Sequence, residues 1–136
     1  MKKLISLIKF PLISDDRGSL VSIEARKALP FEIKRVYYLF GTKPGFARGF
    51  HAHKSLKQLA VCVNGSCRIV LDNGFNKEDI FLNSPTTGLI IEDMVWREIY
   101  EFSVDCVLMV LASEHYDEND YIRNYNDFLR LVKKSW

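Results

Sequence analysis

Two histidines separated by one residue, His51 and His53, carry the most reactive chemistry in this sequence. The residues around them, 47–53, have the pattern of a β-strand, in which side chains two apart point to the same face. Imidazole exchanges a proton near neutral pH and is also the commonest metal ligand in proteins. The pair is therefore a candidate for proton transfer or for metal binding, unless it is a solvated pair on a surface strand.

A strand expected over 34–40 adds a phenol to these two imidazoles. Arg35, Tyr37 and Leu39 would share one face of this strand. If that face meets the imidazoles in one cavity, Tyr37 can relay a proton or polarise an oxygen. Alternatively, Tyr37 is an amphipathic core residue whose hydroxyl reaches the rim.

The elements that position these groups are mainly β-strands. Val, Ile, Phe and Tyr recur in short runs separated by turn residues, among them Pro44, Asn64-Gly65 and Pro85. We expect strands over about 4–10, 19–24, 34–40, 47–53, 57–63, 66–72, 79–82, 88–92, 95–101 and 104–111. Many short strands at this spacing are typical of an all-β sandwich or barrel. With 136 residues, 48% of them hydrophobic, residues 1–136 can form a single domain around one core.

A helix is expected only near the C-terminus. One apolar face repeats there at helical spacing: Tyr125, Phe128, Leu129, Val132 and Trp136. Asn124 or Asn126 can cap the start of this helix, and basic residues suit its end. We expect its apolar face to pack across one sheet.

The charge pattern argues against several classes of partner. The formal net charge is +2, and no run of Lys or Arg marks a nucleic-acid or membrane surface. Lys9, Pro11 and Asp15-Asp16 interrupt any signal peptide that could follow Met1. We therefore expect a cytoplasmic protein with neither a nucleic-acid nor a membrane partner.

The three cysteines, without a Cys-x-x-Cys spacing, predict neither a zinc ribbon nor a disulfide framework. Cys62 and Cys67 flank Asn64-Gly65, and a two-residue hairpin turn at that pair would make the two thiols cross-strand neighbours. One face of the hairpin would carry Gln58, Ala60, Cys62, Cys67, Ile69 and Leu71. The small groups on that face leave room for a ligand between two sheets.

The spacing of His51, His53, Gln58 and Gly65 resembles the first cupin motif, in which a glutamate normally stands where this chain has Gln58. A second cupin motif supplies another histidine, near the place of Trp96-Arg97 here. Gln58 can coordinate only as a neutral group, and an arginine cation would repel a divalent ion. We therefore expect no catalytic metal and no other cofactor.

Three segments resemble the WxcM-like cupins more closely: Asp16-Arg17-Gly18-Ser19-Leu20 with Glu24, Arg48-Gly49-Phe50-His51-Ala52-His53-Lys54 with Gln58, and Tyr121-Ile122-Arg123-Asn124-Tyr125 with Phe128-Leu129. Within this family the chain resembles the bacterial sugar 3,4-ketoisomerases that act on dTDP-4-keto-6-deoxyglucose. The resemblance implies a metal-free jelly-roll homodimer that moves the sugar carbonyl from C4 to C3 through an enediol. Its 3-keto product would be aminated for surface-polysaccharide or S-layer glycan synthesis.

The same resemblance assigns roles to individual residues. His51 is the expected principal base, while Tyr37 and His53 orient groups, shuttle protons or polarise oxygen. Arginine forks suit the oxygens of a diphosphate. The expected substrate-binding residues are Arg48, Arg17, Arg97, Arg35, Gln58 and Lys54.

The configuration of the product at C4 depends on which face of the enediol receives the proton. Residues near Arg17 and Arg97 could decide this, and we expect the ribo (gluco-type) product.

The apolar strand over 4–10 has edge character. Pairing it with a partner's sheet would give a dimer with exchanged N-terminal strands.

Three other functions are compatible with a cupin pocket. A dTDP-sugar epimerase is normally longer, and its histidine is paired with an aspartate that the sequence pattern does not reveal here. A non-catalytic sugar-nucleotide-binding cupin would bind without turnover. A metal-dependent dioxygenase would contain a metal on elemental analysis.

Overall fold

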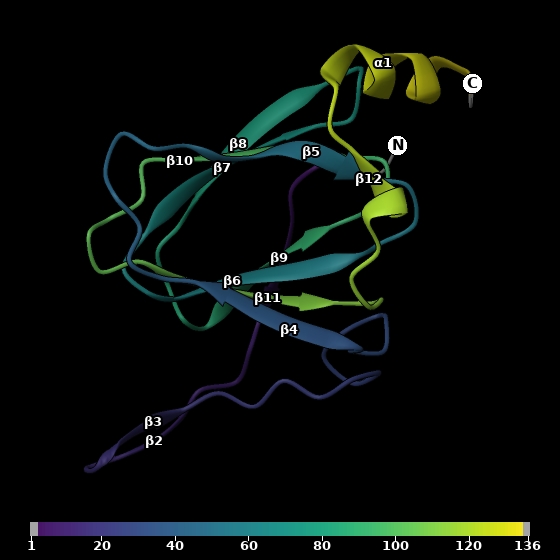
Figure 1. Cartoon of the computed structure of the whole chain (residues 1–136). Helices are drawn as coiled ribbons and strands as arrows, with labels where there is room; N and C mark the ends of the chain where they lie inside the picture. Colours follow the sequence, from purple (N-terminus) through teal and green to yellow (C-terminus); the bar gives the residue numbers. More distant parts are fainter. Residues whose placement is uncertain (1–2, 135–136) are drawn as a thin grey trace.

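Two five-stranded antiparallel sheets face each other and enclose the core (Figure 1). The computed structural model describes residues 3–134. The first sheet has the order β1-β9-β6-β11-β4, formed by Ser6–Lys9, Thr87–Ile91, Gln58–Asn64, Val107–Ala112 and Arg35–Leu39. The second has the order β12-β5-β10-β7-β8, formed by Tyr121–Ile122, Arg48–His53, Trp96–Tyr100, Cys67–Asp72 and Lys77–Leu82. The expected all-β jelly-roll class is confirmed.

The inner faces of the two sheets form the main core, as the alternation of β6 and β7 predicts. Their buried side chains include Ala60, Cys62, Cys67, Ile69 and Leu71. The expected hairpin between these strands is wrong, because β6 pairs with β9 and β11 while β7 pairs with β8 and β10. The turn at Asn64-Gly65 instead carries the chain from one sheet to the other. The alternation of inward and outward side chains along β6 and β7 is the same whether the strands form a hairpin or lie in facing sheets. Inward side chains meet beside each other in the first case and across the sandwich in the second.

The expected C-terminal helix is confirmed as α1, Tyr125–Lys134. Phe128 and Val132 are buried in a cluster with Ala52 and Trp96 of the second sheet, which α1 covers (Figure 1). Asn124 is the cap, since its side-chain oxygen accepts a hydrogen bond from the Asp127 N–H at 3.0 Å. The expected contact of Trp136 lies outside the described residues.

The N-terminal part differs most from expectation. β1 pairs with β9 of its own chain. The strand expected over 19–24 ends at Leu20, because β3 (Gly18–Leu20) forms a short hairpin with β2 (Ile13–Asp15). This β2–β3 hairpin extends away from the sandwich in Figure 1. Residues 21–33 then lay apolar side chains over the outer face of β6.

Two short elements precede α1 and were not expected from the sequence. They are a 3-10 turn, η1 (Glu118–Asp120), and the two-residue strand β12, which pairs with β5. No helix within residues 3–134 is long and apolar enough to cross a bilayer.

Candidate active site

A cavity of about 360 Å³ lies between the two sheets. Its apolar wall is formed by Leu39, Ala60, Ile69, Ile91, Leu108, Ile99 and Val110. Its polar wall contains Arg35, Tyr37, Arg48, His51, Gln58, Arg97, Tyr116, Tyr121 and Arg123. A mostly apolar pocket with a few convergent polar groups is typical of a small-molecule site.

An irregularity in β5 brings Arg48 and His51 into this cavity together. In a regular strand, residues three apart point to opposite faces. Here Arg97 pairs with His51 and Glu98 with Gly49, so Phe50 is an extra residue without an opposite partner. Phe50 has a φ of 60° and Gly49 a φ of 92°, and a Cβ on Gly49 would lie 3.0 Å from the Arg97 carbonyl oxygen. This bulge explains why glycine precedes the histidines.

His51 lines the cavity as a neutral imidazole at pH 7. Burial, followed by the nearby Arg97 cation, lowers the pKa of His51 to about 4. The ring is therefore in the form that can accept a proton.

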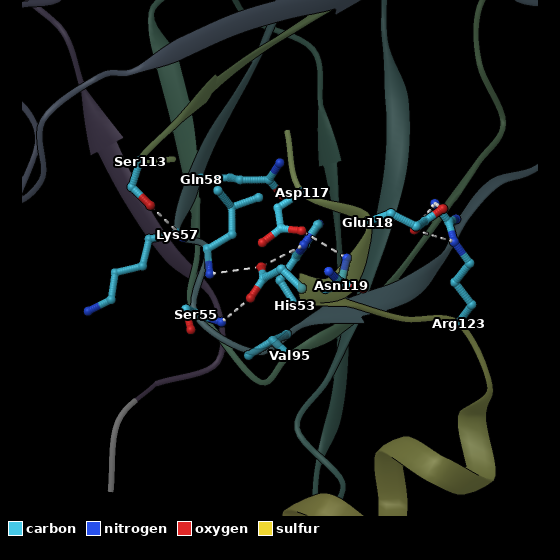
Figure 2. Close-up of polar contacts among 12 residues, drawn as sticks. His53, Ser55, Lys57, Gln58, Val95, Ser113, Asp117, Glu118, Asn119 and Arg123 are labelled. Atoms are coloured by element: carbon cyan, nitrogen blue, oxygen red, sulfur yellow. Dashed lines mark hydrogen bonds and ion pairs between the residues drawn. The ribbon is translucent and has the colours of Figure 1, made fainter. Parts of the chain in front are cut away.

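His53 is more deeply buried, with 1% of its surface exposed, and forms a pair with Asp120. Its Nδ1 lies 3.1 Å from Asp120 Oδ2, and the backbone N–H groups of Ser55 and Leu56 donate to the same carboxylate at 2.9 and 3.3 Å. In Figure 2, dashed lines mark the contacts of His53 and Ser55 with this carboxylate. A carboxylate neighbour favours imidazolium, but burial dominates and lowers the pKa of His53 to about 2. The neutral ring thus donates its Nδ1–H to Asp120. Its buried Nε2, which has no hydrogen-bond partner among residues 3–134, is left as an acceptor.

The two histidines share one side of β5 but line different cavities. Their ring centroids are 5.0 Å apart, with the rings nearly perpendicular. His53 lines a second, more polar cavity of about 470 Å³, formed with residues of the 114–121 segment. His51 and Tyr37 line the first cavity and His53 does not, so the expected placement of all three side chains in one cavity is not met for His53.

Gln58 connects Tyr37 to Arg97 across the cavity wall. Its amide Nε2 donates to the Tyr37 hydroxyl at 2.8 Å, and its Oε1 accepts from Arg97 Nη1. Burial raises the pKa of Tyr37, so the phenol keeps a proton that it can donate. Burial also lowers the pKa of Arg97 to about 10, which leaves a cation at neutral pH.

This arrangement does not suit a divalent metal at the cupin position. Arg97, which is 3% exposed, lies beside Gln58 and opposite His51, and its second nitrogen donates to the Val95 carbonyl at 2.9 Å. An ion held by His51 and Gln58 would stand next to this buried guanidinium. The donor set therefore favours an anion or a developing oxyanion over a second cation.

The other expected binding residues divide into two groups. Arg48 and Arg35 line the cavity, and the Arg35 guanidinium lies 5.2 Å from the Tyr37 ring centroid. Arg17 and Lys54 do not line the cavity of their own chain. Arg17 pairs with Asp15 at 2.7 Å on the projecting hairpin, and its side chain is 86% exposed. Lys54 follows the end of β5 and faces a surface groove beside α1.

Three aromatic or basic residues near the cavity were not identified as site residues from the sequence, and neither was Asp120. The Tyr121 ring lies 5.0 Å from that of His51 and 4.3 Å from that of His53. The Arg123 guanidinium lies 4.1 Å from the Tyr121 ring centroid and is paired with Glu118 at 3.0 Å. Tyr116 completes the group. A two-residue strand has too little periodicity to show that its side chains face a cavity.

Known proteins resemble this chain over almost its full length. The model of the FdtA family, described as "WxcM-like, C-terminal", matches residues 3–133. A TDP-4-oxo-6-deoxy-alpha-D-glucose-3,4-oxoisomerase from Aneurinibacillus thermoaerophilus is 56% identical over 128 residues, which are 94% of this chain and 92% of the relative.

Solved structures give the same result. A 3,4-ketoisomerase from Helicobacter canadensis matches with a TM-score of 0.92 and 50% identity, covering 95% of this chain and 97% of that one. The H51N mutant of QdtA, a 3,4-ketoisomerase from Thermoanaerobacterium thermosaccharolyticum in complex with TDP-4-keto-6-deoxyglucose, matches with a TM-score of 0.95 and 46% identity, covering 100% and 99%. The rmlC epimerase of Mycobacterium tuberculosis, 15% identical with a TM-score of 0.72, shares the fold alone. Because the family model matches residues 3–133 and the curated relative is 56% identical, the chain belongs to the WxcM-like family of FdtA.

Proposed function

We propose that this protein is a sugar-nucleotide 3,4-ketoisomerase that converts dTDP-4-keto-6-deoxyglucose to its 3-keto isomer. The observation that carries the proposal is the cavity that joins neutral His51 and protonated Tyr37 to buried cationic Arg97. An isomerisation by proton transfer needs a base, an acid and a charge that stabilises an enediolate. The relatives named above as 3,4-ketoisomerases support this assignment.

The reaction moves protons off C3 and O3 and onto C4 and O4, without a net change in oxidation state. His51 removes the proton from C3, the C3–H electron pair forms the C3=C4 bond, and the C4 carbonyl electrons move to its oxygen. Tyr37 protonates that oxygen, directly or through water, to give an enediol. The Tyr37 phenolate then takes the O3 proton, which forms the C3 carbonyl, while C4 accepts a proton from the His51 imidazolium, directly or through water, so that both groups return to their starting forms. Arg97 and the Tyr37–Gln58 pair stabilise the oxygen that becomes negative.

His53 is a positioning and relay group in this scheme. Its Nδ1–H is held by Asp120, which leaves Nε2 as the acceptor, and its ring centroid lies 5.0 Å from that of His51 and 4.3 Å from that of Tyr121. A neutral ring in this tautomer keeps the local charge low and leaves His51 unprotonated. The His53–Asp120 pair resembles the histidine–aspartate pairing of dTDP-sugar epimerases. Epimerisation of a dTDP-sugar is therefore the second candidate activity.

The diphosphate would bind to guanidinium groups that line the cavity. Arg48, Arg35 and Arg123 contribute guanidinium groups there. A bound dianion would also raise the low pKa of His51, so that substrate binding strengthens the base. No metal or other cofactor takes part in this scheme.

The test is incubation with dTDP-4-keto-6-deoxyglucose, followed by NMR of the product. A carbonyl at C3 supports the proposal, and the same spectrum gives the C4 configuration, for which we expect the ribo product. Epimerisation with the carbonyl retained at C4 would indicate the epimerase, and binding without turnover would indicate a binding protein. His51→Asn should lower turnover by at least about 10²-fold, the usual scale of general-base catalysis, with dTDP affinity nearly unchanged.

A homodimer would bring Arg17 to a substrate site. The projecting hairpin exposes Ile13 and Leu20 by 63% and 56%, and the outer face of β4 exposes Tyr38 by 60%. Burial of these groups against a second copy would remove large apolar surfaces from water. We propose that exchange of N-terminal segments, in which β1 pairs with β9 of the partner instead of β9 of its own chain, places the hairpin at the partner's cavity.

Mixed dimers test this arrangement. A dimer of Arg17→Ala and His51→Asn chains contains one site with both native residues if Arg17 acts in trans. Recovered activity on mixing supports the exchange, whereas a monomer by light scattering contradicts it. The cytoplasmic location and the supply of a 3-keto sugar for surface-glycan amination remain predictions that accompany this function.

A further inference from the structure

Three cysteine thiols meet in the core below the apolar wall of the cavity. Cys62 comes from β6, Cys67 from β7 and Cys106 from the residue before β11, and each is at most 1% exposed. Their three sulfur atoms lie within 4.8 Å of one another, and the Cys62 and Cys106 sulfurs are 3.6 Å apart. Ala60 and Ile69, each two residues from a cysteine, line the cavity above. The proposed isomerisation uses none of these thiols.

We propose that Cys62, Cys67 and Cys106 form a three-sulfur site for a soft divalent metal ion of the zinc and cadmium type. Zinc–sulfur bonds are about 2.3 Å long, so three sulfurs around one ion stand about 3.8 to 4.0 Å apart. The observed separations bracket that spacing. Small rotations of the cysteine side chains would suffice to form the site. Thiolate ligands also select soft ions over magnesium or calcium.

Charge balance favours a divalent ion in this apolar setting. Phe102 and Leu108 pack in the same buried cluster as the three thiols. Two thiolates neutralise a divalent ion, and the third sulfur completes the coordination. An isolated set of thiolates would be costly at this depth, whereas a neutral metal–thiolate group is not. Without an ion the three groups would simply pack as protonated thiols.

The route to the site passes through surface turns. The Cys62 thiol donates to the Asn64 carbonyl oxygen at 3.2 Å, at the exposed turn between β6 and β7. On the neighbouring turn Val104 is 77% exposed, and Asp105 supplies a carboxylate next to Cys106. Surface turns open locally more readily than the sheets beneath them. The Asp105 carboxylate on this turn would attract a cation.

The test is an anaerobic titration of the reduced protein with Cd²⁺ alone, monitored by the sulfur-to-cadmium charge-transfer absorption. The expected result is saturation at about one ion per chain, with cadmium X-ray absorption reporting three sulfur neighbours. Cys62→Ala, Cys67→Ala and Cys106→Ala should each weaken binding by at least about tenfold. His51→Asn is the matched control, because it removes a possible ligand from the active site and should leave the absorption band unchanged.

Two outcomes would overturn the proposal. One is the absence of a saturable sulfur-to-cadmium band in wild-type protein. The other is a band that persists in the cysteine variants, or a cadmium spectrum dominated by nitrogen and oxygen neighbours. The absorption measurement needs only wild-type protein, so a cysteine variant that fails to fold does not leave the site untested. Neither outcome depends on whether the protein is an isomerase.

Discussion

Replacing Asp120 by asparagine would change the tautomer of His53 while keeping a side chain of nearly the same size and shape. In the native structure both carboxylate oxygens act only as acceptors, Oδ1 from the Ser55 N–H and Oδ2 from the Leu56 N–H and the His53 ring. An asparagine that keeps its oxygen on Ser55 turns an NH₂ group toward the ring and toward Leu56. This NH₂ would donate to His53 Nδ1 and move the imidazole proton to Nε2.

The structure gives the size of both effects. The relocated proton would point into a buried site where Nε2 has no partner among the described residues, and the Leu56 N–H would lose its acceptor. Because Nε2 is already unpaired in the native structure, the newly unpaired group is the Leu56 N–H, and we expect a loss of about 1–3 kcal/mol in unfolding free energy. Turnover should fall by at least about 10²-fold, because a wrongly protonated His53 can no longer accept a proton or orient His51.

The assay combines turnover, dTDP affinity and thermal unfolding. Asp120 lines the second cavity rather than the first, so the affinity for dTDP should stay close to that of the wild type. Asp117→Asn is the matched control. Asp117 is another carboxylate of the same segment and caps η1, and its replacement should leave turnover intact. Nearly full turnover in a folded Asp120→Asn variant would refute the relay role of His53, as would an equal loss in the control.

Three further predictions concern the cavity. Arg48→Ala should raise the dissociation constant for dTDP at least about tenfold, because a charge-assisted contact is worth about 1.5–3 kcal/mol; unchanged affinity in calorimetry would remove Arg48 from the site. Since the pKa of His51 is lowered to about 4 and the base must be neutral, kcat/KM should stay level from pH 8 to about 6 and fall only near pH 4; a decline centred on 6.5 would show that the ring is solvated. Prolonged chelation should leave turnover unchanged, because Arg97 faces the position a cupin metal would occupy; loss of turnover that iron, zinc or manganese restores would contradict this.

The sequence predicted the sandwich, the helix and most of the cavity, because each depends on a local pattern. Tyr37, His51 and Gln58 face the cavity as their strand alternation requires. The entry of Arg48 depends on the bulge at Phe50, and a bulge changes the phase of a strand in a way that alternation cannot reveal.

The features that were missed depend on long-range contacts. Asp120 is 67 residues from His53 in sequence, and their hydrogen bond forms only after β12 adds to the edge of β5. The turn at Asn64-Gly65 fits a hairpin equally well in sequence. Which sheet receives β7 is decided by pairing with β10, about thirty residues further along the chain.

The strand order of the first sheet has a consequence for how the chain folds. In the order β1-β9-β6-β11-β4, no hydrogen-bonded neighbours are consecutive in sequence, so this sheet cannot grow from local hairpins. Long loops must close before any of its pairings form, which typically gives folding times of milliseconds to seconds. During that interval the apolar strands β6, β9 and β11 are exposed with their edges unpaired. Synthesis at reduced temperature should therefore increase the yield of native protein, since competing aggregation depends on these exposed strands.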